Sequence, residues 1–508
     1  MKILKISAVA AAVCLLATSV SADEAKPKRQ LKNNMMVKTN IAPKSVDSIA
    51  DMFGEGMFYG RLRMNVFNWD WKNDATADNK AFGLGGSLVY KTAAWQGVSA
   101  MAGLYVTSSP FSSLRDNVAD VGATKAGKDT FSRYQVATGG AWEYAVLAEA
   151  NLQYKIANTT AIAGRQIFES FLTKSNDTKM IPNTFEGLVL EMKEIPKTTI
   201  RGAYFTAQKL RDHTTFHDVI TFGDSVAANS TTNFGSWNNN DDSAVHKGLS
   251  YKNFTNAGAD VNHELIVVDM RNKSIDNLQV DVTYGSVPDV LSSITGELNY
   301  KIDLGGASLT PGVRYMKQMD NGGGVIGGAS LSGKVTAANG VASGYSNGDS
   351  LDSSLSMARL VLKTGALKVQ VAYSAVEDAA DIVAPWRGFP TGGYTRAMAQ
   401  YNWRANTKTT AAEVAYDFDK AGLVPGFSAM ARYAIQNFDE TKQDLSATLL
   451  GGVQADSKIL HMDFRENITK DLYAKIRVGL VSADDRVKAG SGDKDSYNEY
   501  RFELNYLF

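Results

Sequence analysis

Hydrophobic and polar residues alternate with a period of two in many segments of this chain. Near the end of the sequence, Tyr500, Phe502 and Leu504 share one parity, while Arg501 and Glu503 share the other. Because successive side chains of a β-strand point to opposite faces, this alternation predicts strands with one apolar and one polar face. The pattern predicts about eighteen strands, at residues 57–67, 81–91, 96–106, 146–155, 160–168, 185–193, 198–208, 264–271, 278–285, 294–303, 308–317, 355–364, 366–375, 409–418, 427–436, 457–466, 472–481 and 497–508.

The length and charge of these segments narrow the fold class. Each is about ten residues long, the length of a tilted transmembrane strand. Their polar faces carry charges that a dry β-sandwich core would not tolerate unpaired. Two architectures fit: a sheet with one face in water, or a barrel with lipid outside and water inside. Aromatic residues such as Tyr284, Tyr300 and Tyr373 end several apolar faces, which favours an all-β, antiparallel transmembrane β-barrel.

The connections support this topology. Short turns and long loops alternate along the threaded strands, which places both ends of the barrel on the periplasmic side. The segment 395–403 also alternates weakly. We place it within the loop 376–408, where it can fold into the lumen; the alternatives are that it extends the following strand or that the strand register slips nearby.

The N-terminus has the features of a targeting signal. Lys2 and Lys5 precede an apolar stretch, and Val20-Ser21-Ala22 offers small residues for cleavage. We therefore expect residues 1–22 to be a signal peptide, residues 23–56 a periplasmic leader and residues 57–508 the barrel. The only cysteine, Cys14, falls within the signal, so the mature chain offers no disulfide and no thiolate site.

The balance of charged residues bears on the expected partners. The 53 basic and 53 acidic residues balance to zero, whereas a nucleic-acid-binding protein usually has a basic excess. We therefore expect no nucleic acid partner, and nothing in the sequence implies a cofactor or a metal. The expected partners are outer-membrane lipid, lipopolysaccharide and small permeant molecules.

Several motifs resemble those of one family. Residues 48–56 (SIADMFGEG), 60–63 (GRLR) and 67–71 (FNWDW) resemble the mature N-terminus of OprD-type porins. Residues 164–166 (GRQ) and 177–187 (DTKMIPNTFEG) resemble the third loop and following strand of that family, and residues 416–427 resemble its late periplasmic turn. The resemblance implies a passive outer-membrane porin, monomeric or homotrimeric. It admits small water-soluble solutes, carboxylate-bearing or like amino acids or peptides, past an arginine ladder and inward-folding loops.

The alternation itself places many charged residues on the inner face. Arg165 is the strongest candidate for contact with a permeant, because it enters the loop that resembles the family's constriction. The full set of pore-lining or constriction candidates is Arg165, Lys179, Arg61, Arg63, Arg201, Arg314, Arg359, Arg387, Arg432, Arg477, Asp177, Glu297 and Asp463.

Other interpretations stay open. The inner charges could pair across strands and brace the wall. The long loops could serve a surface receptor or an adhesin, and an outer-membrane hydrolase is a third alternative. Residues 385–394 could form a second constriction element or a rim that packs on other loops. We expect His213 and His217, four residues apart in the loop 209–263, to be solvated and not to bind a metal.

Overall fold

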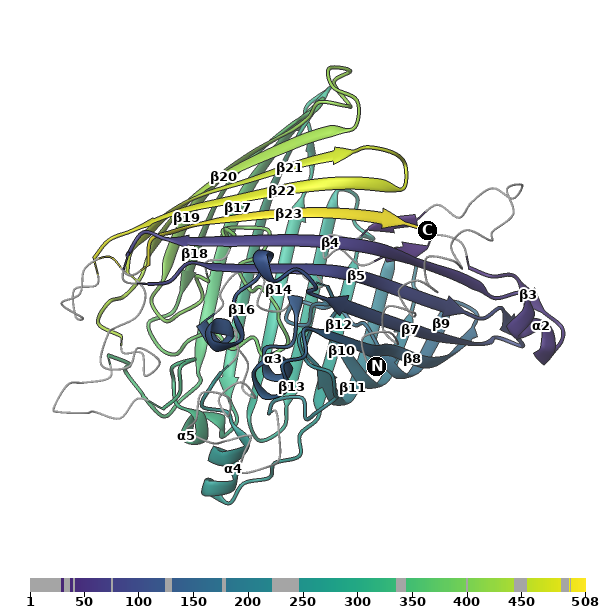
Figure 1. Ribbon diagram of the computed structural model, residues 1–508, viewed down its shortest axis with the longest axis horizontal. Helices are drawn as coiled ribbons and strands as arrows, with labels where there is room; N and C mark the ends of the chain where they lie inside the picture. The colour runs from purple at the N-terminus through teal and green to yellow at the C-terminus, as the bar shows by residue number, and fades with distance from the viewer. Residues whose placement is uncertain are drawn as a thin grey trace.

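The computed structural model describes residues 29–31, 37–39, 42–74, 76–123, 130–175, 180–221, 246–334, 344–398, 401–442, 455–485, 493 and 495–508. Within them, eighteen long strands form one closed antiparallel barrel (Figure 1). The last strand pairs with the first, with Tyr497 opposite Trp71 and Leu507 opposite Arg61. No strand edge is therefore left for hydrogen bonding in the membrane, where an unpaired backbone group is costly.

The strands follow one another around the barrel in chain order. They are β4 (Met57–Trp71), β5 (Asn79–Lys91), β7 (Val98–Ser108), β8 (Glu143–Ile156), β9 (Thr159–Gln166), β10 (Thr184–Met192), β11 (Thr198–Lys209), β12 (Leu265–Asn272), β13 (Leu278–Val287), β14 (Leu291–Tyr300), β16 (Ala307–Asp320), β17 (Ser353–Thr364), β18 (Leu367–Val376), β19 (Lys408–Asp417), β20 (Phe427–Asn437), β21 (Ser457–Asn467), β22 (Leu472–Ala483) and β23 (Tyr497–Leu507).

Short strands, helices and turns accompany the eighteen barrel strands. A hairpin joins β1 (Arg29–Leu31) to β2 (Val37–Thr39), and β3 (Ser45–Val46) pairs in parallel with β6 (Ala94–Trp95). The helices are α2 (Ile49–Gly54), α3 (Arg133–Gly139), α4 (Tyr251–Ala257) and α5 (Gly323–Gly327), with 3-10 turns η1 (Ser112–Leu114) and η2 (Val118–Ala123) and a two-residue strand β15 (Ile302–Asp303). Among the described residues, no helix has the length and apolar content needed to cross a membrane.

The predicted strands agree closely with this architecture. Every predicted segment overlaps one of the eighteen strands, so the fold class is confirmed. The described residues of 395–403 contain no strand and lie in the loop between β18 and β19, as expected. The structure departs from the expected alternation of short and long connections at 288–290. There a tight turn with Asp289 at φ 59° joins β13 to β14 at the end that carries the long loops.

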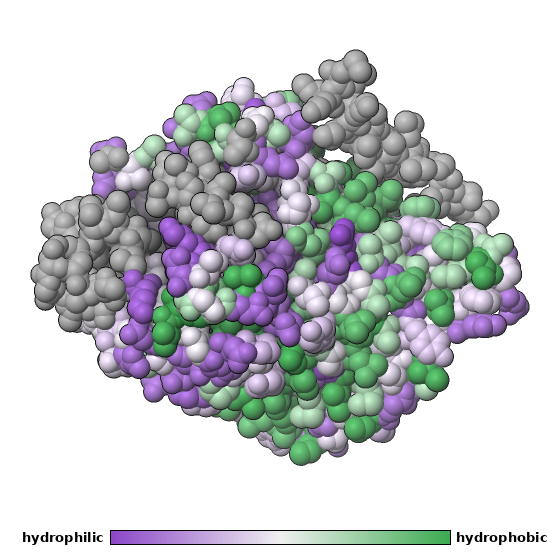
Figure 2. Space-filling view, turned by 90° about the horizontal axis from the view of Figure 1, so that it is seen from below, coloured by the Kyte–Doolittle hydropathy of each residue, from purple (hydrophilic) through white to green (hydrophobic). Residues whose placement is uncertain are grey.

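The outer face of the barrel is apolar. Exposed side chains such as Leu188, Val371 and Tyr315 alternate with residues that point inward. Figure 2 shows hydrophilic residues gathered over the loop end at the left and more hydrophobic ones over the strand wall toward the right. An exposed apolar band of this kind is stable in lipid and unfavourable in water.

Candidate pore and constriction

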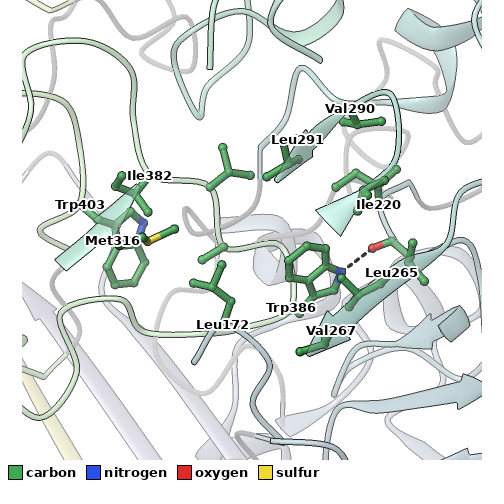
Figure 3. Close-up of a cluster of buried hydrophobic side chains, with 14 of the residues drawn as sticks. Leu172, Ile220, Leu265, Val267, Val290, Leu291, Met316, Ile382, Trp386 and Trp403 are labelled. Carbon is green, nitrogen blue, oxygen red and sulfur yellow. Dashed lines mark hydrogen bonds between the residues drawn. The ribbon is translucent and has the colours of Figure 1, made fainter. Parts of the chain in front are cut away.

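Loops fill the end of the barrel that lies away from the short turns. A large cluster of buried apolar side chains joins residues of four long loops, those after β9, β11, β16 and β18, to the inward faces of strands that include β11, β12, β16 and β17. Trp386 lies in this cluster with 2% of its surface exposed, and its Nε1 donates a hydrogen bond of 2.8 Å to the Val219 carbonyl (Figure 3). Leu172, from a third loop, belongs to the same cluster. Apolar burial therefore holds these loops inside the barrel.

A second cluster packs the loop between β7 and β8 against the opposite wall. Phe131 and Trp142 contact each other edge to face, with ring centroids 4.8 Å apart. Together with Val136 of α3 they join a buried group that includes Phe67 of β4 and Tyr497 of β23. The loop end of the lumen thus has an apolar core on both sides.

Farther along the strands from the loop end, beyond these clusters, the inward-facing residues become charged. Along β11 the inward residues run from Phe205 and Ala203, which belong to the apolar cluster, to Arg201. The same change separates Val267 from Asp269 on β12, and Met316 from Arg314 on β16. On these strands the inward residues thus change from apolar to charged at matching positions. The charged residues form a ring, the charged ring, that begins where the apolar clusters of the loop end, the loop core, stop.

Glu297 organises the charges of β14, β16 and β17. Its Oε2 lies 2.6 Å from Arg314 Nη2, and its Oε1 lies 3.2 Å from Arg359 Nη2. Tyr394, from the loop between β18 and β19, lies beneath both guanidinium groups, which are 4.6 Å and 4.3 Å from its ring centroid. Burial, together with the nearby carboxylate of Glu297, raises the pKa of Tyr394 to about 12, so its hydroxyl stays protonated.

Gly312 provides room for this cluster. A Cβ atom at position 312 would lie 2.5 Å from Asn299 Oδ1 and 3.1 Å from both Arg359 Nε and Tyr394 Oη. Real Cβ contacts are essentially never as short as the first of these distances. Because Gly312 of β16 has no side chain, the guanidinium of Arg359 can reach Asn299 and Glu297.

Wall arginines also hold the inward-folded loop by its backbone. Arg314 Nη1 donates to the carbonyls of Pro390 and Gly392 at 2.9 Å and 3.1 Å. Arg359 Nη1 donates to the Gly393 carbonyl at 3.2 Å, and Arg432 Nη1 donates to that of Arg396. Charged donors make strong hydrogen bonds to carbonyls in a partly desolvated site, so these arginines fix the loop as well as lining the wall.

Two further clusters repeat the arrangement of two cations around one carboxylate. Glu413 of β19 bonds Arg432 of β20 and, at 2.6 Å, Lys368 of β18. Asp463 of β21 lies 2.8 Å from Lys475 and 3.2 Å from Arg477, both on β22.

Other arginines of the wall pair with one carboxylate each. These pairs include Arg201–Asp269 at 2.6 Å, Arg165–Glu186 at 2.8 Å, Arg501–Glu499 at 2.6 Å and Arg63–Glu503 at 3.5 Å. Arg61 lies on the same inward face of β4 as Arg63, and both are 1% exposed. Arg165 is 39% exposed and stacks over the Phe216 ring at 4.4 Å. The ion pairs between neighbouring strands support the alternative that these charges brace the wall.

Arg387 is placed differently from the wall arginines. It lies in the loop between β18 and β19, is fully buried and lies 3.4 Å from Asp212, on the loop after β11. A β-bridge joins it to Thr173, in the loop after β9. Residues 385–394 thus pack on other loops and also contact the wall; that they form a second constriction stays a prediction. Asp177 and Lys179 lie outside the described residues.

Sequence reasoning missed the acidic partners Asp269 and Glu186, and also Lys174. Asp269 has the inward parity of β12, so the alternation could have identified it. Lys174, in the loop after β9, has a lowered pKa because it is buried, although Glu169 opposes the shift. No pattern in the sequence predicts that Lys174 is buried, because its burial depends on strands that are distant in the chain.

The expectation that the two loop histidines are solvated is wrong for His213. His213 is 8% exposed, and its Nδ1 lies 2.9 Å from His217 Nε2. His217 Nδ1 contacts the carbonyls of Asp218 and Thr221, both at 2.8 Å. The loop folds into the lumen, which buries His213 and leaves His217 half-buried. In the described part of the chain no group of three or more His, Cys, Asp or Glu residues could hold a metal ion.

The hydrolase alternative requires a nucleophilic serine. Residues 344–348 (GYSNG) have the spacing of a nucleophile elbow. However, Ser346 is exposed in a loop, with no strand directly before it and no helix directly after it. The strand-to-helix turn that activates such a serine is therefore missing at this position.

A closed eighteen-stranded barrel with an apolar exterior and a charged inner ring defines an outer-membrane barrel protein. A family model described as outer membrane porin, OprD family, matches residues 120–508. The chain therefore belongs to the OprD family of outer membrane porins, whose place is the bacterial outer membrane and whose members are channels for small solutes.

Solved structures share the fold. Acinetobacter baumannii OccAB1 is 15% identical, with a TM-score of 0.66, over 92% of this chain and 99% of that chain. Pseudomonas aeruginosa OccK8 (OprE) is 16% identical, with a TM-score of 0.64, over 90% and 99%. Pseudomonas aeruginosa OpdK, solved with vanillate, is 14% identical, with a TM-score of 0.62, over 90% and 99%. No match was found among curated protein sequences.

Proposed function

We propose that this porin admits small solutes that carry a carboxylate, through a pore narrowed by loops and lined by arginine and lysine. The observation that carries the proposal is the excess of cations in three clusters. Glu297, Glu413 and Asp463 each contact two cationic side chains of the wall. Within each cluster two cations therefore face a single carboxylate, and this local excess of positive charge attracts anions into the lumen.

The geometry suits transfer better than tight binding. Lys368 and Arg165 are 35% and 39% exposed, so water reaches their charged groups. A carboxylate can exchange some of its water for such donors and then move to the next cluster, because each donor already has a resident acid partner. Passage by this route is passive and needs no cofactor. Lipopolysaccharide as a lipid partner and a monomeric or homotrimeric state belong to the same proposal.

Liposome swelling tests the solute class. We expect the purified porin to admit a small carboxylate, such as benzoate, faster than benzamide, which has nearly the same size and shape but no charge. Equal rates, or faster entry of benzamide, would contradict the proposal. Liposomes containing porin with Lys368→Gln and Lys475→Gln provide the matched comparison, because the preference for benzoate should shrink while benzamide entry stays the same.

A further inference from the structure

Helix α2 lies at the rim of the barrel, beside the turn between β5 and β7. The Ala93 amide donates a 3.0 Å hydrogen bond to the Met52 carbonyl, and the Tyr90 hydroxyl donates to that of Phe53. Strand β3, just before the helix, pairs with β6 in the same turn. In Figure 1 the helix lies at the right-hand end of the molecule, beyond the strands. These contacts fix α2 at the end of the barrel with the short turns.

The contacts also show on which side of the rim the helix lies. Phe58 of β4 and Tyr90 of β5 are paired residues on the outward face, with ring centroids 4.6 Å apart. Gly56, which follows the helix, packs so close to Tyr90 that a Cβ atom there would lie 2.3 Å from the hydroxyl oxygen. The C-terminal end of α2 therefore lies against an outward-facing ring.

The exposed face of α2 is apolar. Ile49 and Phe53, four residues apart and thus on one side of the helix, are 54% and 58% exposed. Phe58, which directly follows on the outer wall, is 62% exposed. Met52 is buried, and Ser48 caps the helix through the Asp51 amide. Since large apolar side chains rarely stay in water as a group, this surface needs a partner.

We propose that α2 is an interfacial anchor, with Ile49 and Phe53 inserted among the lipids of the periplasmic leaflet. The surface is continuous with Phe58 and hence with the lipid-facing band of a porin wall. Short turns mark the periplasmic end of bacterial barrels, which assigns the leaflet. A short helix with one apolar face can lie in the plane of the headgroups and bury that face to shallow depth. The anchor would direct the chain before β4 along the membrane surface and away from the pore mouth.

The single cysteine of the sequence makes a site-specific test possible. Ile49→Cys, Phe53→Cys and the control Glu55→Cys are each prepared in the full chain with Cys14→Ser, and each carries one nitroxide label. Glu55 is exposed and is the polar C-cap residue of the helix. In proteoliposomes of phosphatidylethanolamine and phosphatidylglycerol, collision rates are measured with oxygen, which concentrates in lipid, and with a water-soluble nickel chelate.

We expect the ratio of oxygen to nickel collisions to be higher at positions 49 and 53 than at position 55. Similar ratios at all three positions would overturn the proposal, because the helix would then lie in periplasmic water. Low accessibility to both reagents at 49 and 53 would also overturn it, since a protein surface would then cover them. Ion conductance of each labelled porin confirms that the barrel is folded.

Discussion

Two regions of the lumen, the loop end and the charged ring, are held by different interactions. At the loop end, Trp386, Phe205 and Leu265 bury apolar surface and make the loops part of a core. In the charged ring, Glu297, Glu413 and Asp463 gather guanidinium and ammonium groups that still reach water. The comparison teaches that apolar packing sets the shape of the entrance, while paired charges set the electrostatic potential along the wall. Arg314, Arg359 and Arg432 belong to both regions, because they bond loop carbonyls and acids.

The largest expected effect comes from the loop core. Trp386→Ala removes a buried ring and its bond to the Val219 carbonyl, and such truncations cost about 3–5 kcal/mol of packing energy. We expect the loops after β11 and β18 to lose protection from proteolysis and the single-channel conductance to rise. The strand content should not change.

A matched control is available on α5. Val325 is 64% exposed, so Val325→Ala should leave both the conductance and the cleavage pattern unchanged. If Trp386→Ala behaved in the same way, the loop core would not shape the entrance.

An intermediate effect is expected where the two regions meet. Glu297→Gln removes the charge that both Arg314 and Arg359 contact, and losing a charged partner of a hydrogen bond costs about 1–3 kcal/mol. Anion selectivity should increase, because two positive charges remain unopposed, and the loop at 390–393 should exchange amide hydrogens faster. Reversal potentials and hydrogen exchange measure the two effects; a decrease in anion selectivity would contradict the assignment.

Acid should loosen the loop end before it affects the wall. Burial lowers the pKa of His217 and of His246 from 6.5 to about 4. A released loop therefore binds more protons than the packed loop below pH 6.5, so packing loses stability as the pH falls from 6.5 toward 4. Hydrogen exchange at 210–221 and 246–249 should accelerate over this range. His217→Gln with His246→Gln should flatten the dependence, and an unchanged slope would exclude these two residues as its origin.

The smallest effect is expected at Arg165. Its pair with Glu186 is about two-fifths exposed, and exposed ion pairs contribute about 0–1 kcal/mol. Arg165→Gln should leave thermal stability unchanged and slow carboxylate entry slightly. Calorimetry and liposome swelling check this, with Lys470→Gln in a distant turn as the control; a large drop in melting temperature would show that Arg165 is mainly structural.

The strands could be predicted from the sequence because each depends on a local alternation. One face of a strand meets lipid and is apolar, and the other meets water and is polar. The sequence also placed Arg314, Arg359 and Glu297 on one inner face, since parity alone decides the face. It did not predict the apolar loop core, whose contacts, such as Trp386 with Val219, join residues far apart in the chain. The adjacent apolar residues Leu265, Ile266, Val267 and Val268 on β12 were a signal, because such a run is apolar on both faces of a strand. The burial of His213 and the partial burial of His217 depended on the same unpredicted loop packing.

The most direct test of the charged ring is the reversal potential in asymmetric salt. Arg359→Gln, Lys368→Gln and Lys475→Gln together remove one cation from each cluster and leave every acid one partner. We predict that the unaltered porin favours anions over cations and that the triple variant loses most of this preference. A cation-selective porin, or a triple variant with an unchanged reversal potential, would contradict the account.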